Sequence, residues 1–354
     1  MQQQQDRVLL KITLAGLGLI AGIFGLVAWL VDGGTFSEPA LRSENDSPDS
    51  SLSSVATVSE DQIDGIQDVP KGLFNYGGST TWIPVHKPVN EAITRAFPDF
   101  QLRYTLPPNG APGSGTGVEM LLDGQLSFSE SSRPLKPSEY DTAQQRGFTL
   151  EQVPAALDGI ALAVHPDLDI PGLSVDQLQA IYTGVVTNWS ELGGPDLPIT
   201  AYSRPPEAAG TAEYFLDSII DAETYGANVI FVKDTTTGIR QVLAERGGIY
   251  YASAPEIVNQ CSIYALPIAS QEQPDTFVPP FAEPWKAGQA CINQPNVINK
   301  VAFREGAYPL TRRLFVIVKA DGSRDETAGR AYVNMLLSDE GQALLEEAEF
   351  ISIR

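Results

Sequence analysis

The stretch GSGTGVEMLLDGQLSFSESSRPL, residues 113–135, carries the pattern that decides the fold. A run of small residues, Gly113–Gly117, precedes an expected helix at Val118–Leu122 and an expected strand at Leu126–Ser129. The start of a helix offers unpaired backbone N–H groups and about half a positive charge. Glycine and hydroxyl residues let an oxyanion approach those groups closely. The stretch therefore indicates an α/β unit with a turn suited to an anion, although a capped helix or a simple glycine turn has the same composition.

The same design occurs twice more in the chain. The loop Gly77–Thr81 (GGSTT) follows an apolar strand, and Ala208–Thr211 (AAGT) follows a strand at Ile199–Tyr202. Three such segments favour an anion site, because a tetrahedral anion needs donors from several directions. Arg204 precedes the third segment, and a guanidinium suits phosphate because it donates two parallel hydrogen bonds. An arginine after a strand is more often a surface charge, but next to this helix start we expect a ligand.

The chain beyond Pro70 alternates between strands and helices, which predicts an α/β fold. Further strands are expected at Leu73–Tyr76, Gln101–Leu106, Phe148–Val153, Gly159–Val164, Gly248–Tyr251 and Leu314–Lys319. Further helices are expected at Pro84–Phe97, Val175–Tyr182, Ile239–Ala244 and Glu326–Glu347.

The N-terminus predicts a membrane anchor in residues 1–31. The run Ile12–Val31 has no charged residue, and about 20 apolar residues at 1.5 Å each span a bilayer core. Arg7 and Lys11 precede this run, so we expect the rest of the chain outside the cytoplasm. A cleaved signal peptide is the alternative, but its apolar region is usually roughly 7–15 residues long and ends in small residues. Residues 32–70, rich in Ser, Asp, Glu and Pro, are expected to form a disordered linker.

Length and charge limit the partners of the chain. Its 354 residues suit about two domains. The formal net charge of -21 repels nucleic acid at long range. The same charge also repels phosphate, so an anion site in this chain must rely on local donors.

These segments together resemble the periplasmic phosphate-binding protein of the ABC phosphate transporter. The likeness runs in chain order from about residue 72 to the C-terminus, and its most specific phrases are GSGTG…SSRPL and IYTG…NW. The other similar stretches are GGSTTW, LDGIALAVHP, PITAYSRPPEAAGT, GGIYYASA and YPLTRRLFVIVK.

The resemblance implies a periplasmic-binding-protein fold, in which two α/β lobes joined by a double-crossing hinge clamp inorganic phosphate. It places residues 71–157 and 262–354 in lobe I and residues 158–261 in lobe II. The chain would cross between lobes near Leu157 and return near Cys261. The implied partner is an ABC permease, and the implied location is the periplasm or another extracytoplasmic space. The implied phosphate-binding residues are Ser79, Thr80, Thr81, Trp82, Ser114, Gly115, Thr116, Ser132, Arg133, Arg204, Ala209, Gly210 and Thr211.

Two departures from the family pattern affect the expected ligand. The family often has an aspartate at the position of Ser132, where it accepts the proton of bound hydrogen phosphate. It also often has GSGT where this chain has AAGT, so Ala209 replaces a donor serine. Backbone N–H groups survive both changes, so anion binding is still expected, with a weaker basis for choosing phosphate over other oxyanions. Arg133 is either an additional ligand or the partner of a neighbouring acid such as Glu130.

The sequence gives little support to catalysis. His86 and His165 are the only histidines, and neither has metal-ligand spacing. The chain lacks the nucleophile-elbow, dinucleotide-binding and P-loop motifs. We therefore expect a monomeric binding protein with no catalytic residue, cofactor or metal. A phosphate sensor or buffer without transport, a receptor for another oxyanion, and a cryptic enzyme such as a phosphatase remain as alternatives.

Cys261 and Cys291 are the only cysteines. In an oxidising compartment a lone pair of cysteines often forms a disulfide. Two buried free thiols are the alternative.

The uncharged run Ile12–Val31 generates a first prediction. If it is an uncleaved anchor, the protein stays in the membrane fraction after high-salt and carbonate washes, because only the bilayer core holds it there. Immunoblotting of the washed fractions measures this. A mature protein whose N-terminal sequencing begins near Asp32 would show instead that the run is removed.

Overall fold

The computed structural model describes residues 62–206 and 209–354. The expected anchor at Ile12–Val31 and most of the expected linker lie outside these residues. Within the described ranges, no helix is long and apolar enough to cross a membrane.

The folded region begins earlier than the sequence predicts. Ile63, in the short 3-10 helix Ile63–Gly65, is buried in a hydrophobic core, although the expected linker extends to Pro70. The backbone N–H of Ile63 donates to Glu340 Oε2 at 3.1 Å. Because this segment buries an apolar side chain and satisfies its backbone, residues 62–70 belong to the fold rather than to a linker.

The elements alternate as the sequence predicts, and the described residues form an α/β fold. The strands are β1 (Gly72–Gly78), β2 (Phe100–Tyr104), β3 (Phe128–Ser131), β4 (Thr149–Val164), β5 (Leu173–Ser174), β6 (Thr200–Ser203), β7 (Val229–Phe231), β8 (Gly248–Ser253), β9 (Tyr264–Leu266), β10 (Ile268–Ala269) and β11 (Thr311–Ala320). The helices are α1 (Ile83–Ala96), α2 (Ser114–Leu122), α3 (Pro137–Gln145), α4 (Val175–Thr183), α5 (Gly210–Tyr214), α6 (Thr235–Ala244), α7 (Ala254–Val258), α8 (Gly288–Asn293), α9 (Lys300–Arg304), α10 (Arg324–Leu337) and α11 (Asp339–Glu347).

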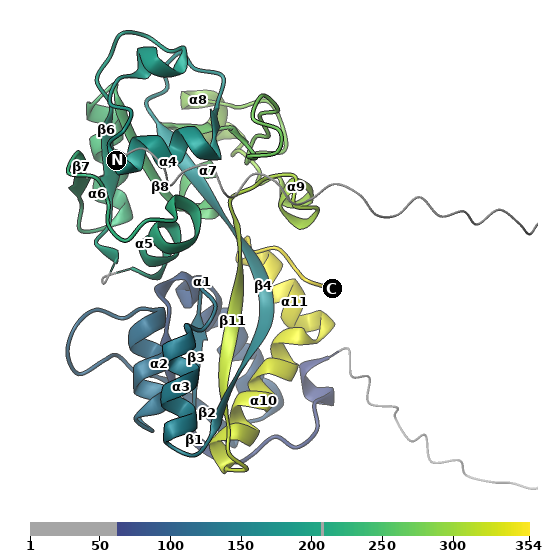
Figure 1. Cartoon of the computed structure of the whole chain (residues 1–354). Helices are drawn as coiled ribbons and strands as arrows, with labels where there is room; N and C mark the ends of the chain where they lie inside the picture. The colour runs from purple at the N-terminus through teal and green to yellow at the C-terminus, as the bar shows by residue number, and fades with distance from the viewer. Residues whose placement is uncertain (1–61, 207–208) are drawn as a thin grey trace, which may run out of the picture. The chain divides into compact units, whose positions relative to one another are not determined.

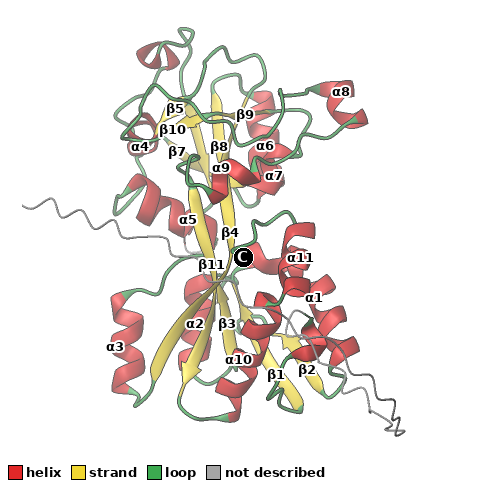
Figure 2. Ribbon diagram, turned by 90° about the vertical axis from the view of Figure 1, so that its right-hand side faces the viewer, coloured by secondary structure: helices red, strands yellow, loops and turns green. Residues whose placement is uncertain are grey.

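Two long neighbouring strands, β4 and β11, connect two lobes (Figure 1). The main sheet has the order β2-β1-β3-β11-β4-β8-β6-β7, and β9 also pairs with β4. The first part of β4 pairs with β11, while its last residues pair with β8 and β9. Figure 2 shows the strands of one lobe fanning out below this crossing, with helices on both faces. The expected double crossing is therefore present.

The path of β4 differs from the sequence prediction of two separate strands. Residues 149–164 form one strand, because β11 pairs with it across the intervening residues. The register shifts between Leu314 and Phe315, opposite Pro154, which has no N–H to contribute to the ladder. The expected single C-terminal helix is likewise two helices, because Ser338 ends α10 and caps the first turn of α11.

The return to the first lobe occurs later than expected. The sequence analysis placed it near Cys261, but residues 262–310 stay with the second lobe and the chain returns on β11. In this segment β9 pairs with β4, and β10 pairs with β5. Its buried side chains, such as Ile268, Phe303 and Leu310, share one core with that lobe. We therefore define lobe I as residues 62–157 and 313–354, and lobe II as residues 159–310, with Asp158 and Arg312 at the crossing.

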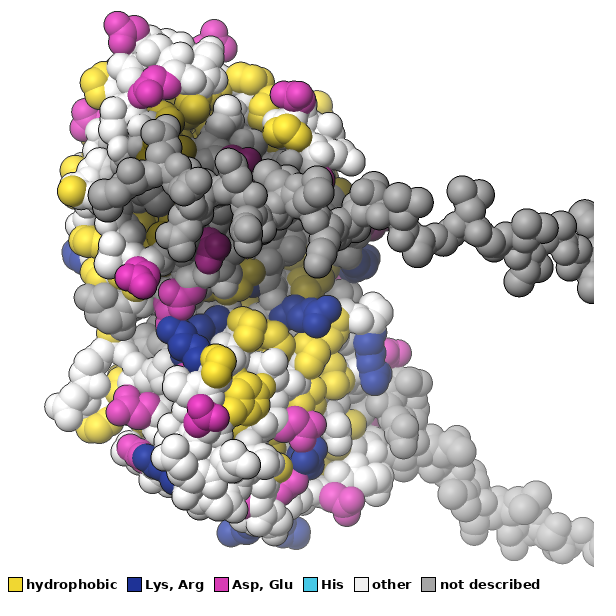
Figure 3. Space-filling view, viewed as in Figure 1, with side chains coloured by type: hydrophobic (Ala, Val, Ile, Leu, Met, Phe, Trp, Pro, Cys, Tyr) yellow, Lys and Arg dark blue, Asp and Glu magenta, His cyan; other side chains and the backbone are white. Residues whose placement is uncertain are grey.

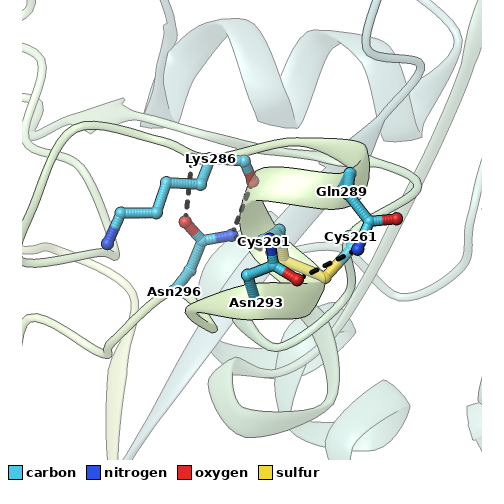
Figure 4. The surroundings of a disulfide bond; sticks show 6 residues. All are labelled: Cys261, Lys286, Gln289, Cys291, Asn293 and Asn296. Atoms are coloured by element: carbon cyan, nitrogen blue, oxygen red, sulfur yellow. Dashed lines mark hydrogen bonds between the residues drawn. A yellow bond between two sulfur atoms is a disulfide. The ribbon is translucent and has the colours of Figure 1, made fainter.

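The expected disulfide joins Cys261 to Cys291 in lobe II (Figure 4). Cys291 is fully buried in α8, and the carbonyl of Cys261 accepts a hydrogen bond from the N–H of Gly288 at 3.0 Å. Asn296 holds the chain beside the bridge through hydrogen bonds with the backbone of Lys286. The disulfide therefore fixes the end of a long segment that has little regular structure of its own.

Removing this bridge should destabilise lobe II. The two cysteines are separated by 30 residues, and closing such a loop stabilises by roughly 3–4 kcal/mol on the chain-entropy model. Cys291→Ala should lower the unfolding midpoint measured by circular dichroism. Reductant should lower the wild-type midpoint and leave that of the variant unchanged. A wild-type midpoint that is insensitive to reductant, with two alkylatable thiols by mass spectrometry, would contradict the bridge.

Candidate functional site

Three serines of lobe I meet where parallel strands end. Ser79 follows β1 and Ser132 follows β3, which are parallel neighbours in the sheet. Ser114 begins α2, which comes after β2 on the other side of β1. The carboxyl ends of parallel strands share one edge of a sheet, which is where ligands bind in open α/β folds. The three serines are far apart in the sequence, but the fold brings them together at this edge of the sheet.

The three serine side chains form a buried hydroxyl cluster. All three residues have no exposed surface. Ser79 Oγ donates to Ser132 Oγ at 2.9 Å, and Ser114 Oγ lies 3.2 Å from Ser132 Oγ. The backbone N–H of Ser132 donates to Ser114 Oγ at 3.1 Å. Each hydroxyl can both donate and accept, so the cluster can turn donors toward an anion.

Lobe II brings Gly210 against this hydroxyl cluster. A Cβ atom at Gly210 would lie 2.8 Å from Ser114 Oγ and 2.9 Å from Ser132 Oγ. A side chain here would therefore displace the serine hydroxyls, because the backbone of lobe II approaches the hydroxyls of lobe I directly. Gly210 belongs to the predicted anion-type segment Ala208–Thr211, and α5 begins at this residue.

Of the other predicted residues in lobe I, Thr81 faces lobe II and Trp82 packs beneath the loop. Thr81 Oγ1 lies 3.5 Å from Thr211 Oγ1, so these two hydroxyls also meet across the lobes. The Trp82 N–H donates to the Ser79 carbonyl at 3.3 Å, and its indole Nε1 donates to the Ser131 carbonyl at 3.3 Å. Trp82 is fully buried and supports the loop from behind.

Two further predicted residues have local partners. Thr116 Oγ1 donates to the carbonyl of Ala111 at 3.1 Å, which uses its hydroxyl within the loop. The N–H of Ala209 donates weakly to the carbonyl of Pro206 at 3.4 Å. Gly115 lies close to the Arg133 guanidinium, and Thr80 is partly buried in the first turn after Ser79.

Arg204 lies directly after β6, as predicted, and is partly buried. It lines a narrow pocket of lobe II together with Thr211, Tyr250, Tyr251 and Glu256. Thr211 belongs both to this pocket and to the threonine contact with Thr81. The pocket of Arg204 is therefore adjacent to the place where the lobes meet.

Arg133 pairs with acids other than Glu130. Its guanidinium donates two hydrogen bonds to Glu139, at 2.8 and 3.0 Å, and its Nε lies 3.0 Å from Glu213 Oε1. Lys136 also contacts Glu213, at 2.9 Å. Burial alone would lower the pKa of Arg133, but Glu139 and Glu213 raise it overall. Because Glu213 belongs to lobe II, these ion pairs join the two lobes beside the hydroxyl cluster.

A fully buried ion pair at the crossing was not selected from the sequence. Arg312 and Asp158 are register partners in the β4–β11 ladder, and neither side chain has exposed surface. One N–H of Arg312 Nη2 donates to Asp158 Oδ2 at 2.7 Å, and the other is shared between Thr211 Oγ1 at 2.8 Å and Thr81 Oγ1 at 3.0 Å. The available signal was a pair of arginines, Arg312 and Arg313, directly before the apolar run LFVIVK, and an aspartate at the start of the buried run DGIALAV.

Glu130 holds the backbone of Ser79, one member of the hydroxyl cluster, in place. Its carbonyl accepts a hydrogen bond from the N–H of Ser79 at 2.8 Å. Its carboxylate contacts His86 Nε2 at 2.7 Å and accepts a hydrogen bond from the Tyr332 hydroxyl at 2.9 Å. Burial acts to lower the pKa of His86, but the charge and hydrogen bond of Glu130 outweigh it, so the pKa is raised.

The groups gathered at this site are hydrogen-bond donors and charges suited to holding an anion. The site brings hydroxyl groups and arginines to the place where two lobes meet, and the described residues contain no cluster of three or more metal-ligating side chains. On the face shown in Figure 3, the visible charged side chains of lobe II are mainly acidic, and those of lobe I are of both signs. This face offers no broad positive surface, so an anion would have to be attracted by local donors.

Comparison with known proteins relates this arrangement to one superfamily. The chain matches the family described as the PBP superfamily domain over residues 56–340. The phosphate-binding protein PstS of Staphylococcus haemolyticus is 27% identical over 286 residues, covering 80% of this chain and 81% of the relative. PstS of Staphylococcus epidermidis is 26% identical over 286 residues, covering 80% and 79%.

Solved structures show the same fold. An ABC-type phosphate transport receptor from Vibrio cholerae superposes with a TM-score of 0.60 at 20% identity, covering 78% of this chain and 99% of that chain. PstS from Borrelia burgdorferi superposes with a TM-score of 0.53 at 19% identity, covering 80% and 100%.

The His86–Glu130 pair generates a prediction of pH dependence. Because the pKa of His86 is raised in the folded protein, the stability that it contributes is complete below the unfolded value, about 6.5. That contribution is lost as pH rises through the folded pKa. Urea unfolding between pH 5.5 and 8.5 should therefore show a steeper loss of stability in wild type than in His86→Gln.

His165→Gln is the matched control for this measurement. His165 Nδ1 lies 3.9 Å from Oδ2 of the exposed Asp167, and an ion pair with a solvent-exposed partner contributes little to stability, so this variant should keep the wild-type slope. If the free energy of unfolding falls equally steeply with pH in wild type and His86→Gln, a charged His86–Glu130 pair is contradicted.

Proposed function

This chain belongs to the PBP superfamily, and from that premise we propose that it is a receptor that captures inorganic phosphate between its two lobes and delivers it to an ABC permease. The observation that carries the proposal is the hydroxyl cluster of Ser79, Ser114 and Ser132, which faces Gly210 of the opposite lobe. Serine hydroxyls and a bare glycine backbone supply the short donors that a small oxyanion needs.

Positive charge for the anion comes from Arg204 in this proposal. Arg204 and Thr211 line the same pocket, and a guanidinium can contact two phosphate oxygens at once. The hydroxyls of Thr81 and Thr211 and the backbone N–H of Ser114 are further donors in this proposal. By contrast, the N–H groups of Trp82 and Ala209 would first have to leave the carbonyls of Ser79 and Pro206. Arg133 acts at the edge of the site, because its guanidinium is engaged by Glu139 and Glu213.

The names of the relatives support phosphate as the ligand. The staphylococcal proteins are phosphate-binding proteins called PstS, and they match about four-fifths of this chain. The Vibrio structure is an ABC-type phosphate transport receptor. A receptor role agrees with two lobes that meet at a small polar site.

The proposal extends to the location of the protein. The uncharged run Ile12–Val31 would hold the receptor at the outer surface of the cytoplasmic membrane as a monomer, with residues 32–61 as a tether. A phosphate sensor or buffer is the second candidate, since a permanent tether suits it equally. Deletion of the gene separates the two: a receptor is needed for phosphate uptake, and a sensor only for the response to starvation.

Selectivity follows from Ser132. An aspartate in a buried site accepts a phosphate proton and repels sulfate, and such buried acceptors can discriminate by about 10⁴-fold. The hydroxyl of Ser132 can rotate and donate to sulfate instead. This chain should therefore discriminate less sharply than a receptor with a carboxylate at that position.

Calorimetry on the full-length protein in detergent tests the proposal. Phosphate and arsenate should bind, and sulfate should compete more weakly. Ser132→Asp should sharpen the rejection of sulfate across pH 6–9, because it restores a proton acceptor. Arg204→Ala should weaken phosphate binding by at least tenfold, because a desolvated charged hydrogen bond is lost.

Two results would contradict this account. Absence of phosphate binding by the wild type would refute the receptor proposal. If the ratio of the dissociation constants for sulfate and phosphate is the same in wild type and Ser132→Asp, Ser132 does not face the anion.

A further inference from the structure

Arg312 contacts one threonine from each lobe, although it belongs to none of the three anion-type segments. It lies on β11 where the chain crosses between lobes, and its residue surface is 2% exposed. Because one N–H of its Nη2 is used by Asp158, the other is shared between Thr81 Oγ1 of lobe I at 3.0 Å and Thr211 Oγ1 of lobe II at 2.8 Å. Both bonds can exist only when the two lobes are close together.

The guanidinium is fixed by its surroundings. Asp158 Oδ2 accepts from both Nε and Nη2 of Arg312, at 2.9 and 2.7 Å. Asp158 Oδ1 accepts a further hydrogen bond from Ser253 of β8. The ring of Tyr214 lies 5.9 Å from Arg312 Cζ, and the Tyr214 hydroxyl donates to the Thr311 carbonyl at 3.0 Å. Arg312 is therefore held at a defined position relative to both crossing strands.

These bonds determine what the threonine hydroxyls can do. A threonine hydroxyl has one proton to donate and two lone pairs. Because Arg312 only donates, Thr81 and Thr211 accept from it, and their own protons are directed elsewhere. The two oxygens are 3.5 Å apart, so at most one of them donates to the other. At least one hydroxyl proton is left for a ligand at the place where the lobes meet.

Arg312 also retains an unused donor. Its Nη1 is buried and has no hydrogen-bond partner among the described residues. Leaving a charged donor without a partner in the interior is unfavourable. A negative charge bound between the lobes would offset this cost through its attraction to the guanidinium, which is strong where water is excluded.

We infer that Arg312 is the positioning residue that couples anion binding to lobe closure, by holding Thr81 and Thr211 together and directing their hydroxyl protons to the anion. This inference rests on the proposed function. Arg312, at the crossing between the lobes, thereby contributes to ligand affinity. Its position in the sequence does not suggest this role, because it is far from the three small-residue segments. Arg204 contacts the anion in the proposed site, whereas Arg312 acts through the two threonines.

The first test compares phosphate binding by calorimetry in the full-length wild type and three variants. Arg312→Lys keeps the charge but loses the planar fork, and it should weaken binding at least tenfold. The double variant Arg312→Gln/Asp158→Asn removes both buried charges together, so that neither is left unpaired, and it should weaken binding further. Arg313→Lys is the matched control, because Arg313 is the exposed neighbour on β11, and its affinity should equal that of wild type.

A double-mutant cycle separates positioning from a general structural role. If Arg312 acts through Thr211, then Arg312→Lys should cost much less affinity in a Thr211→Val background than in wild type. Fully additive losses would contradict action through this threonine. Thermal unfolding without phosphate identifies any variant that does not fold, and Arg312→Lys then carries the test.

Lobe closure is measured independently with spin labels. The native cysteines are paired in a disulfide and do not react with the label. Spin labels on cysteines introduced at exposed Gln144 of lobe I and Glu223 of lobe II therefore report the distance between the lobes. Without phosphate, Arg312→Lys should broaden this distance distribution relative to wild type and Arg313→Lys. Phosphate should narrow it in wild type more than in Arg312→Lys.

The outcomes distinguish the two proposals. Wild type that binds no phosphate overturns the receptor proposal, and the inference falls with it. Wild type that binds phosphate, with Arg312→Lys of the same affinity and the same distance distribution, overturns the inference alone.

Discussion

A fully buried ion pair lies where both long strands pass between the lobes, and the binding geometry depends on it. Asp158 of β4 and Arg312 of β11 are register partners with no exposed side-chain surface. Removing two charges from water is costly, and the attraction between them compensates only when the geometry is good and other hydrogen bonds satisfy the remaining groups. Thr81, Thr211 and Ser253 supply those bonds. The polar groups that stabilise the crossing therefore also define where the lobes meet.

Around this crossing, the rest of the site follows from the chemistry of parallel strands. The loops after β1 and β3, and the start of α2, deliver short hydroxyl side chains to one edge of the sheet. Lobe II meets them with Gly210, whose missing side chain permits the close approach. Ion pairs of Arg133 and Lys136 with Glu213 hold the rim of the two lobes together. The candidate site thus has three parts. These are the buried hydroxyl cluster, the Asp158–Arg312 pair at the crossing, and the ion pairs of Glu213 with Arg133 and Lys136 at its edge.

The sequence predicted the parts of this site that depend on local composition. Strand, small residues and helix could be recognised at Ser79, Ser114 and Gly210, because backbone conformation and helix starts impose those residue types locally. The long-range contacts could not be predicted. Arg312 contacts Thr81, 231 residues away, and nothing near either residue in the sequence specifies that pairing. Arg133 likewise pairs with Glu139 and with Glu213 of the other lobe rather than with Glu130, since the choice is made by tertiary packing.

The fold shows the same division between local and long-range information. Alternating elements were predictable from the hydrophobic pattern, and the family resemblance implied the crossing near Leu157, whereas the return crossing lies at Arg312 on β11, well beyond the expected position near Cys261. Residues 262–310 remain with lobe II because β9 pairs with β4 and the disulfide anchors the segment there. Ile63 was assigned to a linker because its neighbours are polar, yet one buried apolar side chain was enough to bring that segment into the fold.

The central claim is that a small oxyanion binds at the hydroxyl cluster between the lobes. A crystal structure of the protein grown with phosphate tests it most directly. The account predicts tetrahedral density within about 3.5 Å of the hydroxyls of Ser114, Ser132 and Thr211, with the serine hydroxyls turned toward it. Phosphate bound elsewhere, while the hydrogen bonds of Ser132 to Ser79 and Ser114 stay intact, would contradict the account.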